Sequence, residues 1–218
     1  MERPRICAVI VDNDLEAVNE VGPFVDLFEV RIDLIGDGWR ETAKQLKQPW
    51  IATNRSADEG GRWEGSEERR IDELLKAVEL GADIVDVELR TRNLDEIIPV
   101  IKNRAECLLS FHDLEETPLI DRMMEMVQGQ LRAGADICKV VTTAQSFEDN
   151  LTVLQLIAKF PETRIVSFAM GPLGYTSRVL CSLVGGDFNY ASIERGKESA
   201  PSQITVRGLR KLYEMVIG

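Results

Sequence analysis

Short apolar stretches of β-type composition recur eight times along the chain and alternate with stretches of helical spacing. In the helical stretches, apolar residues return every three or four positions among charged ones, as at Ile71, Leu74 and Val78. The eight predicted strands cover residues 5–11, 26–33, 50–54, 83–89, 106–112, 136–142, 164–170 and 187–193. Strands and helices that alternate in this way imply parallel strands joined by crossover helices.

Eight such units favour an α/β fold closed into a (β/α)8 TIM barrel. The chain has 218 residues, which is near the small end of that fold and leaves little room for a second domain. We therefore expect one barrel domain over residues 1–218, without an amino-terminal extension, because the first strand begins by about residue 5. The alternative is a doubly wound open sheet, although no G-x-G-x-x-G follows the first strand and no P-loop occurs.

Glycine, proline and N-cap residues indicate where the helices begin and end. The sequences LGADI at 80–84 and AGADI at 133–137 each predict a glycine in the left-handed conformation after a helix, with a strand following at once. Thr117 before Pro118 predicts a helix N-cap with proline at the first helical position.

Charge and composition exclude several classes of protein. The chain carries 26 basic and 37 acidic residues, a net charge of −11, which repels nucleic acid and anionic membranes. It has no apolar run of about 20 residues and no signal-peptide layout, so we expect a cytoplasmic protein that does not bind membranes. The four cysteines are widely spaced without a CxxC pair, which favours reduced core thiols over disulfides or a zinc site.

Charged residues share one face of two predicted strands. Between 28 and 33, Glu29, Arg31 and Asp33 alternate with apolar residues, so period two places the charges on one face. If the apolar face packs on the helices, these charges point into the barrel. The alternative is a half-exposed antiparallel strand with solvated charges.

The fourth strand repeats this pattern with Asp86, Glu88 and Arg90 at its carboxyl end, and the third strand ends at Arg55. In (β/α)8 barrels the chemistry lies at the carboxyl ends of the strands. These residues are therefore candidates for a functional site that takes a polar ligand.

Lys139 and His112 point to a class of reaction. Lys139 lies within the apolar run ICKVV, where burial disfavours an ammonium ion and favours the free amine that imine-forming enzymes use. The alternative is a structural lysine paired with Glu88 or Asp86. His112, the only histidine, ends the fifth strand and can both accept and return a proton. The pair indicates an imine-forming lyase or aldolase for a hydroxylated, anionic carbonyl compound.

No ligand cluster for a metal is visible, and an imine supplies the electrophile itself, so we expect neither a metal nor an organic cofactor.

Together these motifs resemble the type I 3-dehydroquinate dehydratases of the shikimate pathway, from the first strand to the last helix. The matching segments are EVRID at 29–33, Arg55 with EGG at 59–61, DVEL at 86–89, SFHD at 110–113, Lys139, Met170 with 174–178, and KESAPSQ at 197–203. The resemblance implies a homodimeric hydro-lyase that converts 3-dehydroquinate to 3-dehydroshikimate and water. In biosynthesis, the shikimate pathway leads to chorismate and the aromatic amino acids.

The resemblance also implies a role for individual residues. Lys139 would form the imine with the substrate ketone, and His112 would move protons, with Glu59 orienting or charging it. Six residues would contact the substrate: Glu29, Arg31, Arg55, Arg178, Ser199 and Gln203. An arginine such as Arg178 suits a carboxylate, because its guanidinium can hold both oxygens.

Residues 193–202 carry Gly196 and Pro201 and follow the eighth strand, so we expect a lid that closes over bound substrate. The alternative for this segment is an ordinary exposed turn.

For the whole chain, two other functions stay open. An aldolase would share the imine but break a carbon–carbon bond, whereas a ligand-binding barrel would use Lys139 only as a paired charge.

Overall fold

The computed structural model describes residues 3–217, and in it the first strand pairs with the last. Strand β1 (Ile6–Ile10) lies between β2 (Leu27–Arg31) and β8 (Asn189–Ser192), and every strand pair is parallel. The other strands follow in chain order: β3 (Trp50–Thr53), β4 (Ile84–Glu88), β5 (Glu106–His112), β6 (Ile137–Thr143) and β7 (Ile165–Met170). This order is that of a (β/α)8 barrel, so the alternative of a doubly wound sheet is wrong.

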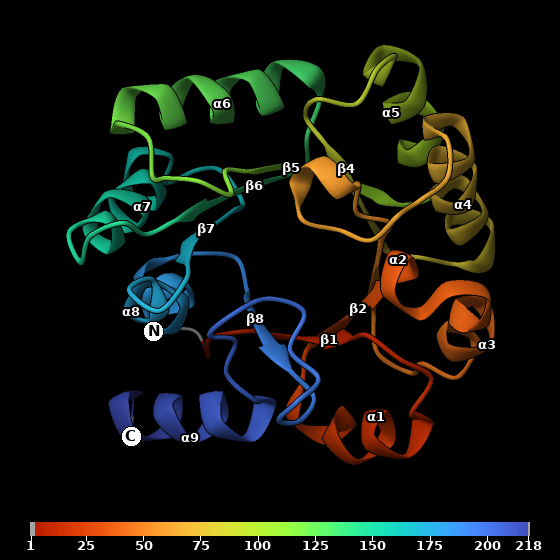
Figure 1. The fold of residues 1–218 in the computed structure, drawn as a ribbon, viewed down its shortest axis with the longest axis horizontal. Coiled ribbons are helices and arrows are strands. Elements are labelled where there is room, and N and C mark those ends of the chain that lie inside the picture. The colour runs from red at the N-terminus through yellow and green to blue at the C-terminus, as the bar shows by residue number, and fades with distance from the viewer. Residues whose placement is uncertain (1–2, 218) are drawn as a thin grey trace.

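Helices surround the barrel on its outside (Figure 1). They are α1 (Leu15–Val21), α2 (Ile32–Ile35), α3 (Trp39–Lys44), α4 (Glu67–Leu80), α5 (Leu94–Lys102), α6 (Ile120–Ala133), α7 (Asp149–Lys159), α8 (Tyr175–Leu180) and α9 (Val206–Ile217), with short 3₁₀ helices at Gly22–Phe24, Gly36–Gly38, Ala57–Glu59 and Cys181–Val184. Each predicted strand lies within two residues of the observed bounds. None of the helices within residues 3–217 is long and apolar enough to span a bilayer.

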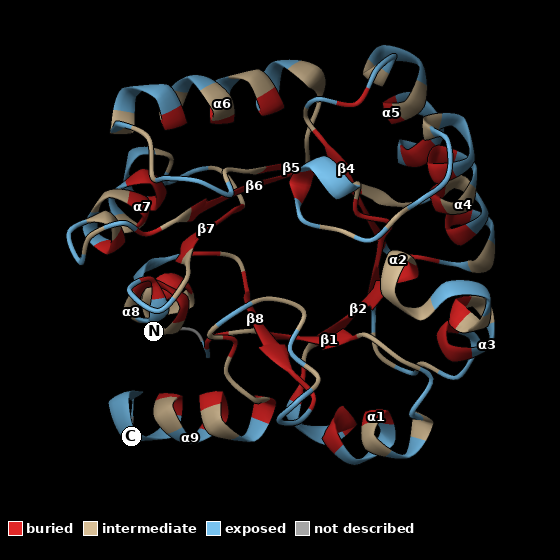
Figure 2. Ribbon diagram, in the orientation of Figure 1, coloured by how far each residue is buried: buried red, intermediate tan, exposed pale blue. Residues whose placement is uncertain are grey.

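The outward faces of the strands form the main core with the helices. Phe28 and Val30 of β2 are buried in one apolar cluster with Leu74 of α4 and Ile101 of α5. Red, buried strands inside helices whose outer sides are exposed show the same layering (Figure 2). The charged face of β2 therefore points into the barrel, as period two predicted.

The barrel interior has two layers of different chemistry. Near the amino ends of the strands the interior is apolar and closed, with Leu27, Ile51 and Leu108 fully buried. Two residues further along the same strands the interior becomes polar. The buried polar residues there are Glu29, Thr53, Asp86, Ser110 and Lys139.

An aspartate before each even-numbered strand ties that strand to its predecessor. The aspartate N–H donates to a carbonyl near the start of the preceding strand, from Asp26 to Ile6, Asp83 to Trp50, Asp136 to Cys107 and Asp187 to Ile165, at 2.8–3.1 Å. In the first three, the carboxylate also accepts the N–H of the same partner residue. The LGADI and AGADI segments supply two of the four.

The last of these aspartates closes the barrel between β7 and β8. Its carboxylate accepts hydrogen bonds from Arg5, before β1, and from Arg164, before β7, both at 3.0 Å. Gly81 and Gly134 end α4 and α6 with φ of 98° and 102°, which confirms the predicted left-handed glycines.

Three details differ from the sequence predictions. Asp33 lies in α2 rather than on a strand, and Arg90 is exposed beyond the end of β4, with its guanidinium over the Phe111 ring. Thr117 is not an N-cap, because α6 begins at Ile120. The Thr117 hydroxyl instead hydrogen-bonds to that of Thr142, at 2.8 Å, and so ties its loop to β6.

All four cysteines are buried and free, which confirms the prediction of reduced core thiols.

Candidate active site

A cavity of about 310 Å³ opens at the carboxyl ends of the strands. It brings together the nine residues to which the resemblance gives a role. They are Glu29, Arg31, Arg55, Glu59, His112, Lys139, Arg178, Ser199 and Gln203. Four other charged candidates from the strand faces do not line it: Asp33, Asp86, Glu88 and Arg90. Within residues 3–217, no group of three or more His, Cys, Asp and Glu side chains is placed to hold a metal ion.

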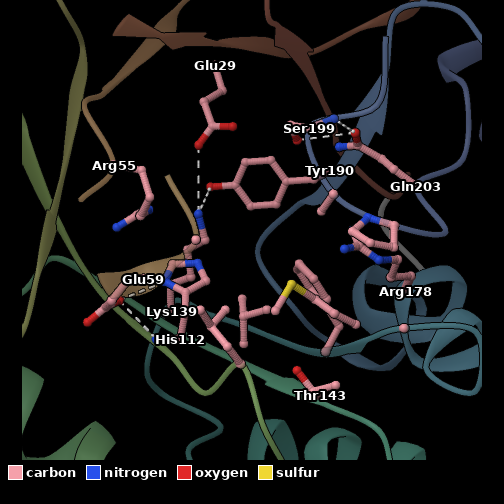
Figure 3. A pocket seen from close by; sticks show the side chains of 18 of the residues that line it. Glu29, Arg55, Glu59, His112, Lys139, Thr143, Arg178, Tyr190, Ser199 and Gln203 are labelled. Carbon is pink, nitrogen blue, oxygen red and sulfur yellow. Dashed lines mark hydrogen bonds and ion pairs between the residues drawn. The ribbon is translucent and has the colours of Figure 1, made fainter. Parts of the chain in front are cut away.

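Lys139 projects from the middle of β6 into this cavity and is 4% exposed. Its Nζ donates to Asp86 Oδ2 at 2.9 Å and to the Tyr190 hydroxyl at 3.0 Å. Glu29 Oε1 lies 3.7 Å away, on the side of the cavity opposite His112 (Figure 3). The ion pair with Asp86 that the structural alternative anticipated is therefore present, but the amine also borders open space.

Asp86 is a partner for this amine that is ionised at neutral pH. Burial alone would raise the pKa of its carboxyl, but the nearby charges of Arg55 and Lys139 outweigh burial and hold that pKa well below its usual range. Arg55 donates to Asp86 Oδ2 at 2.6 Å and to the Ser110 hydroxyl at 2.7 Å, and lies 3.0 Å from Glu88. A carboxylate fixed in this way stabilises positive charge on the Lys139 nitrogen.

His112 is held by Glu59, the contact that the resemblance implied. Glu59 Oε2 accepts the backbone N–H of His112 at 3.0 Å and lies 2.9 Å from its Nδ1. When Glu59 is ionised, the Nδ1–H donates to it, and Nε2 keeps its lone pair for accepting a proton.

Burial acts on both members of this pair. It raises the pKa of Glu59 to about 7, and, with the charges of Arg55 and Lys139, lowers the pKa of His112 well below its ordinary value. His112 is therefore a neutral base at neutral pH.

Glycine-rich backbone lets Glu59 reach His112. Glu59 ends a 3₁₀ turn, and Gly60 after it has φ of 83°, which favours glycine. At Gly61 a Cβ atom would lie 2.0 Å from the carbonyl oxygen of Arg55, so only glycine fits against that strand end.

The two remaining arginines of the site differ in their partners. Arg31 is held by Asp33 through hydrogen bonds of 2.9 and 2.7 Å. Arg178, from α8, is 2% exposed with its guanidinium carbon 4.4 Å from the centre of the Phe168 ring. Among the described residues its Nε has no hydrogen-bond partner, and burial lowers its pKa to about 10. A buried cation left open in this way is suited to an anion.

Residues 193–202, here called the lid segment, cover one side of the cavity. The N–H and hydroxyl of Ser199 donate to Gln203 Oε1 at 2.9 and 3.2 Å, and both residues line the cavity. Lys197 lies outside it and pairs with Asp14 at 2.7 Å and Asp12 at 3.1 Å, in the loop after β1. These ion pairs fasten the lid segment to the opposite end of the chain.

The family model for type I 3-dehydroquinase matches residues 6–217. The chain belongs to this family. The 3-dehydroquinate dehydratase of Dehalococcoides mccartyi (strain CBDB1) is 40% identical over 216 residues, which cover 99% of this chain and 97% of that one. That of Methanocaldococcus jannaschii is 33% identical over 219 residues, covering 97% and 98%.

Solved structures support the same assignment. The 3-dehydroquinate dehydratase of Geobacillus kaustophilus superposes with a TM-score of 0.84 at 26% identity, over 98% of this chain and 91% of that one. The type I enzyme of Clostridium difficile has a TM-score of 0.87 at 22% identity, over 99% and 93%, and so shows the shared barrel fold.

Sequence reasoning missed two polar residues that line this type I 3-dehydroquinase cavity, Tyr190 and Thr143, of which Tyr190 hydrogen-bonds to Lys139. Tyr190 was overlooked because tyrosine in a predicted strand is most simply a core residue. Its signal was its position, two residues from Phe188 and from Ser192, which puts all three on one face.

Proposed function

We propose that the protein dehydrates 3-dehydroquinate to 3-dehydroshikimate and water, as a hydro-lyase of the shikimate pathway, through an imine on Lys139. One observation carries this proposal. A buried lysine, a histidine held by Glu59, and a buried arginine that forms no ion pair with any of residues 3–217 border one cavity within a chain of this family.

The steps follow from the groups present. The Lys139 amine adds to the substrate ketone, and the resulting carbinolamine takes up one proton from solvent and loses water, which gives a protonated imine beside the Asp86 carboxylate. His112 takes a proton from the adjacent carbon, and the electron pair of that C–H bond moves toward the imine nitrogen to form an enamine. The enamine expels the β-hydroxyl, which leaves as water with the proton returned by His112. Hydrolysis of the imine then frees the product and the amine.

The rest of the cavity fits a hydroxylated carboxylate. Arg178 has no ion-pair partner in the described part of the chain and can hold the carboxylate, while Glu29 and Gln203 offer oxygen and amide groups to ring hydroxyls. Arg31, Arg55 and Ser199 complete the substrate contacts in this proposal. Arg31 and Arg55 are already fixed by carboxylates, so they add positive potential with little freedom to move.

Borohydride trapping tests the imine. Incubation with 3-dehydroquinate and borohydride should add the reduced substrate to the peptide that contains Lys139, with the adduct located by mass spectrometry. In parallel, wild-type enzyme should produce the near-ultraviolet absorbance of a conjugated enone, which an aldolase reaction would not give. An unmodified mass from folded protein would contradict the proposal.

Two variants assign the roles. Lys139→Met should abolish turnover, whereas full activity in that variant would leave Lys139 as a structural partner of Asp86. His112→Ala should still trap the adduct but turn over about 100- to 10,000-fold more slowly, because it lacks the acid–base group. Near-normal turnover would remove His112 from the mechanism.

We further propose that the protein acts as a homodimer in the cytoplasm. Exposed apolar side chains near α6 and α7, namely Leu119, Phe147 and Leu151, support an interface. Sedimentation equilibrium should give twice the mass of the 24.5 kDa chain.

A further inference from the structure

The Tyr190 hydroxyl is held in a fixed place beside the reactive amine. Tyr190 is 5% exposed, and its ring packs edge-on against Phe168 and Phe188, with centroids 6.3 and 5.3 Å apart. The hydroxyl lies 3.0 Å from Lys139 Nζ, which is its only hydrogen-bond partner among residues 3–217. Its own proton is therefore not committed to another protein group.

Addition of the Lys139 amine to a ketone requires a proton transfer close to Nζ. The Nζ lone pair forms the new N–C bond, and the carbonyl π pair moves onto oxygen. The adduct then carries a positive nitrogen and a negative oxygen on the same carbon. A proton must pass from nitrogen to oxygen to give the neutral carbinolamine, and a hydroxyl beside Nζ lies next to both atoms.

We propose that the Tyr190 hydroxyl is a catalytic residue of imine formation, which relays this proton from Lys139 Nζ to the former ketone oxygen. The inference rests on the imine proposed above. As the hydroxyl accepts the proton from Nζ, it gives its own proton to the oxygen. Tyr190 is unchanged afterwards, and the transfer needs no further reactant.

The neighbouring groups favour Tyr190 for this role. Asp86 stays ionised, so it can hold the positive nitrogen but has no proton to donate. Burial, and then the negative charge of Glu29, raises the pKa of Tyr190 well above its ordinary value, so its hydroxyl remains protonated. A relay fits a group that does not ionise, because its net charge never changes.

Tyr190→Phe tests the relay, since it removes one oxygen atom and keeps the packed ring. The matched control is Tyr213→Phe, which deletes another buried hydroxyl, one that bonds to Asn189 instead of Lys139. Rapid quenching with borohydride measures the rate of adduct formation. Calorimetry measures binding of a hydroxylated cyclohexane carboxylate that has no ketone.

We expect Tyr190→Phe to form the adduct about 100-fold more slowly, with competitor affinity within twofold of wild type. Tyr213→Phe should match wild type in both measurements. Adduct formation at the wild-type rate in Tyr190→Phe would overturn the role of Tyr190, as would slow trapping accompanied by weakened competitor binding. If wild-type enzyme itself gave no adduct, the imine proposal would fail first.

Discussion

Arg178 shows how a single residue can favour function over stability. Its guanidinium is buried against Phe168 and forms no ion pair with any described residue. Burying a charge without a partner costs free energy of folding, and replacing it with an apolar side chain of similar volume is often stabilising. Substrate carboxylate supplies the missing partner in the proposed complex.

Arg178→Met should therefore affect stability and binding in opposite directions. We expect the Tm of the ligand-free protein to rise by about 5 °C, while KM rises about 100-fold. Differential scanning calorimetry and steady-state kinetics measure the two effects. Arg210→Met is the control, because Arg210 is buried but pairs with Asp26 at 2.8 Å, so its loss should lower Tm. A lower Tm in Arg178→Met would refute this account.

Glu59 makes the activity dependent on pH near neutrality. Its pKa, raised to about 7 by burial, means that the carboxylate is present above pH 7 and is lost as the pH falls through 7. Only the carboxylate accepts the Nδ1–H of His112 and keeps Nε2 unprotonated. We expect kcat/KM to fall on the acid side with an inflection near 7, measured by initial rates.

Glu59→Gln should remove that inflection and lower kcat at least 100-fold, because an amide can donate to Nδ1 and so favours the wrong tautomer. The pKa of His112 itself lies well below its ordinary value and does not explain an inflection near 7. An unchanged pH profile in the variant would assign the inflection to another group.

At the scale of elements, the lid segment depends on charges from the first loop of the barrel. The pairs of Lys197 with Asp12 and Asp14 join the loop after β8 to the loop after β1. Because β1 and β8 are neighbours in the sheet, segments more than 180 residues apart in sequence meet there (Figure 1).

The double variant Asp12→Asn, Asp14→Asn should loosen the lid segment and leave its tryptic sites, Arg195 and Lys197, intact. Asp14 also caps α1 by accepting the N–H of Ala17, and asparagine caps a helix as well. We expect faster trypsin cleavage at these sites and a raised KM. Substrate should protect wild type more than the variant, and equal cleavage rates without ligand would contradict a role for these ion pairs in holding the lid segment.

Element boundaries were predictable from sequence where they depended on local chemistry. The alternation of Glu29 and Arg31 with apolar residues placed them inside the barrel, and the glycine of LGADI correctly ended its helix. Arg90 and Thr117 were placed wrongly because tertiary contacts decided their positions, a ring face for one and a neighbouring strand for the other. The contact between Tyr190 and Lys139 needed the barrel curvature, which no local pattern contains.

At the scale of the whole molecule, stability and chemistry occupy opposite ends of the barrel. The aspartates that tie strand pairs lie at the amino ends, below the apolar layer, while the charged cluster lies above it. One small domain can hold both the aspartates and the charged cluster because the apolar layer between them is filled by side chains.

Asp187→Asn should weaken closure of the barrel without changing its chemistry. The variant loses charge in the pairs with Arg5 and Arg164, which are partly exposed, so we expect Tm to fall by only about 2–4 °C. Hydrogen exchange should increase at β7 and β8, while kcat and KM stay within twofold of wild type. A large loss of activity would show that the two ends are coupled.

The pairing of the sole histidine with Glu59 has a spectroscopic consequence. An enzyme with several histidines needs resonance assignment before its active imidazole can be followed, but here every imidazole signal comes from His112. A ¹⁵N-histidine sample would report the tautomer and protonation state of the active site directly, in the intact protein. In a pH titration the same signals would report the ionisation of Glu59, and on addition of substrate they would report the formation of the imine.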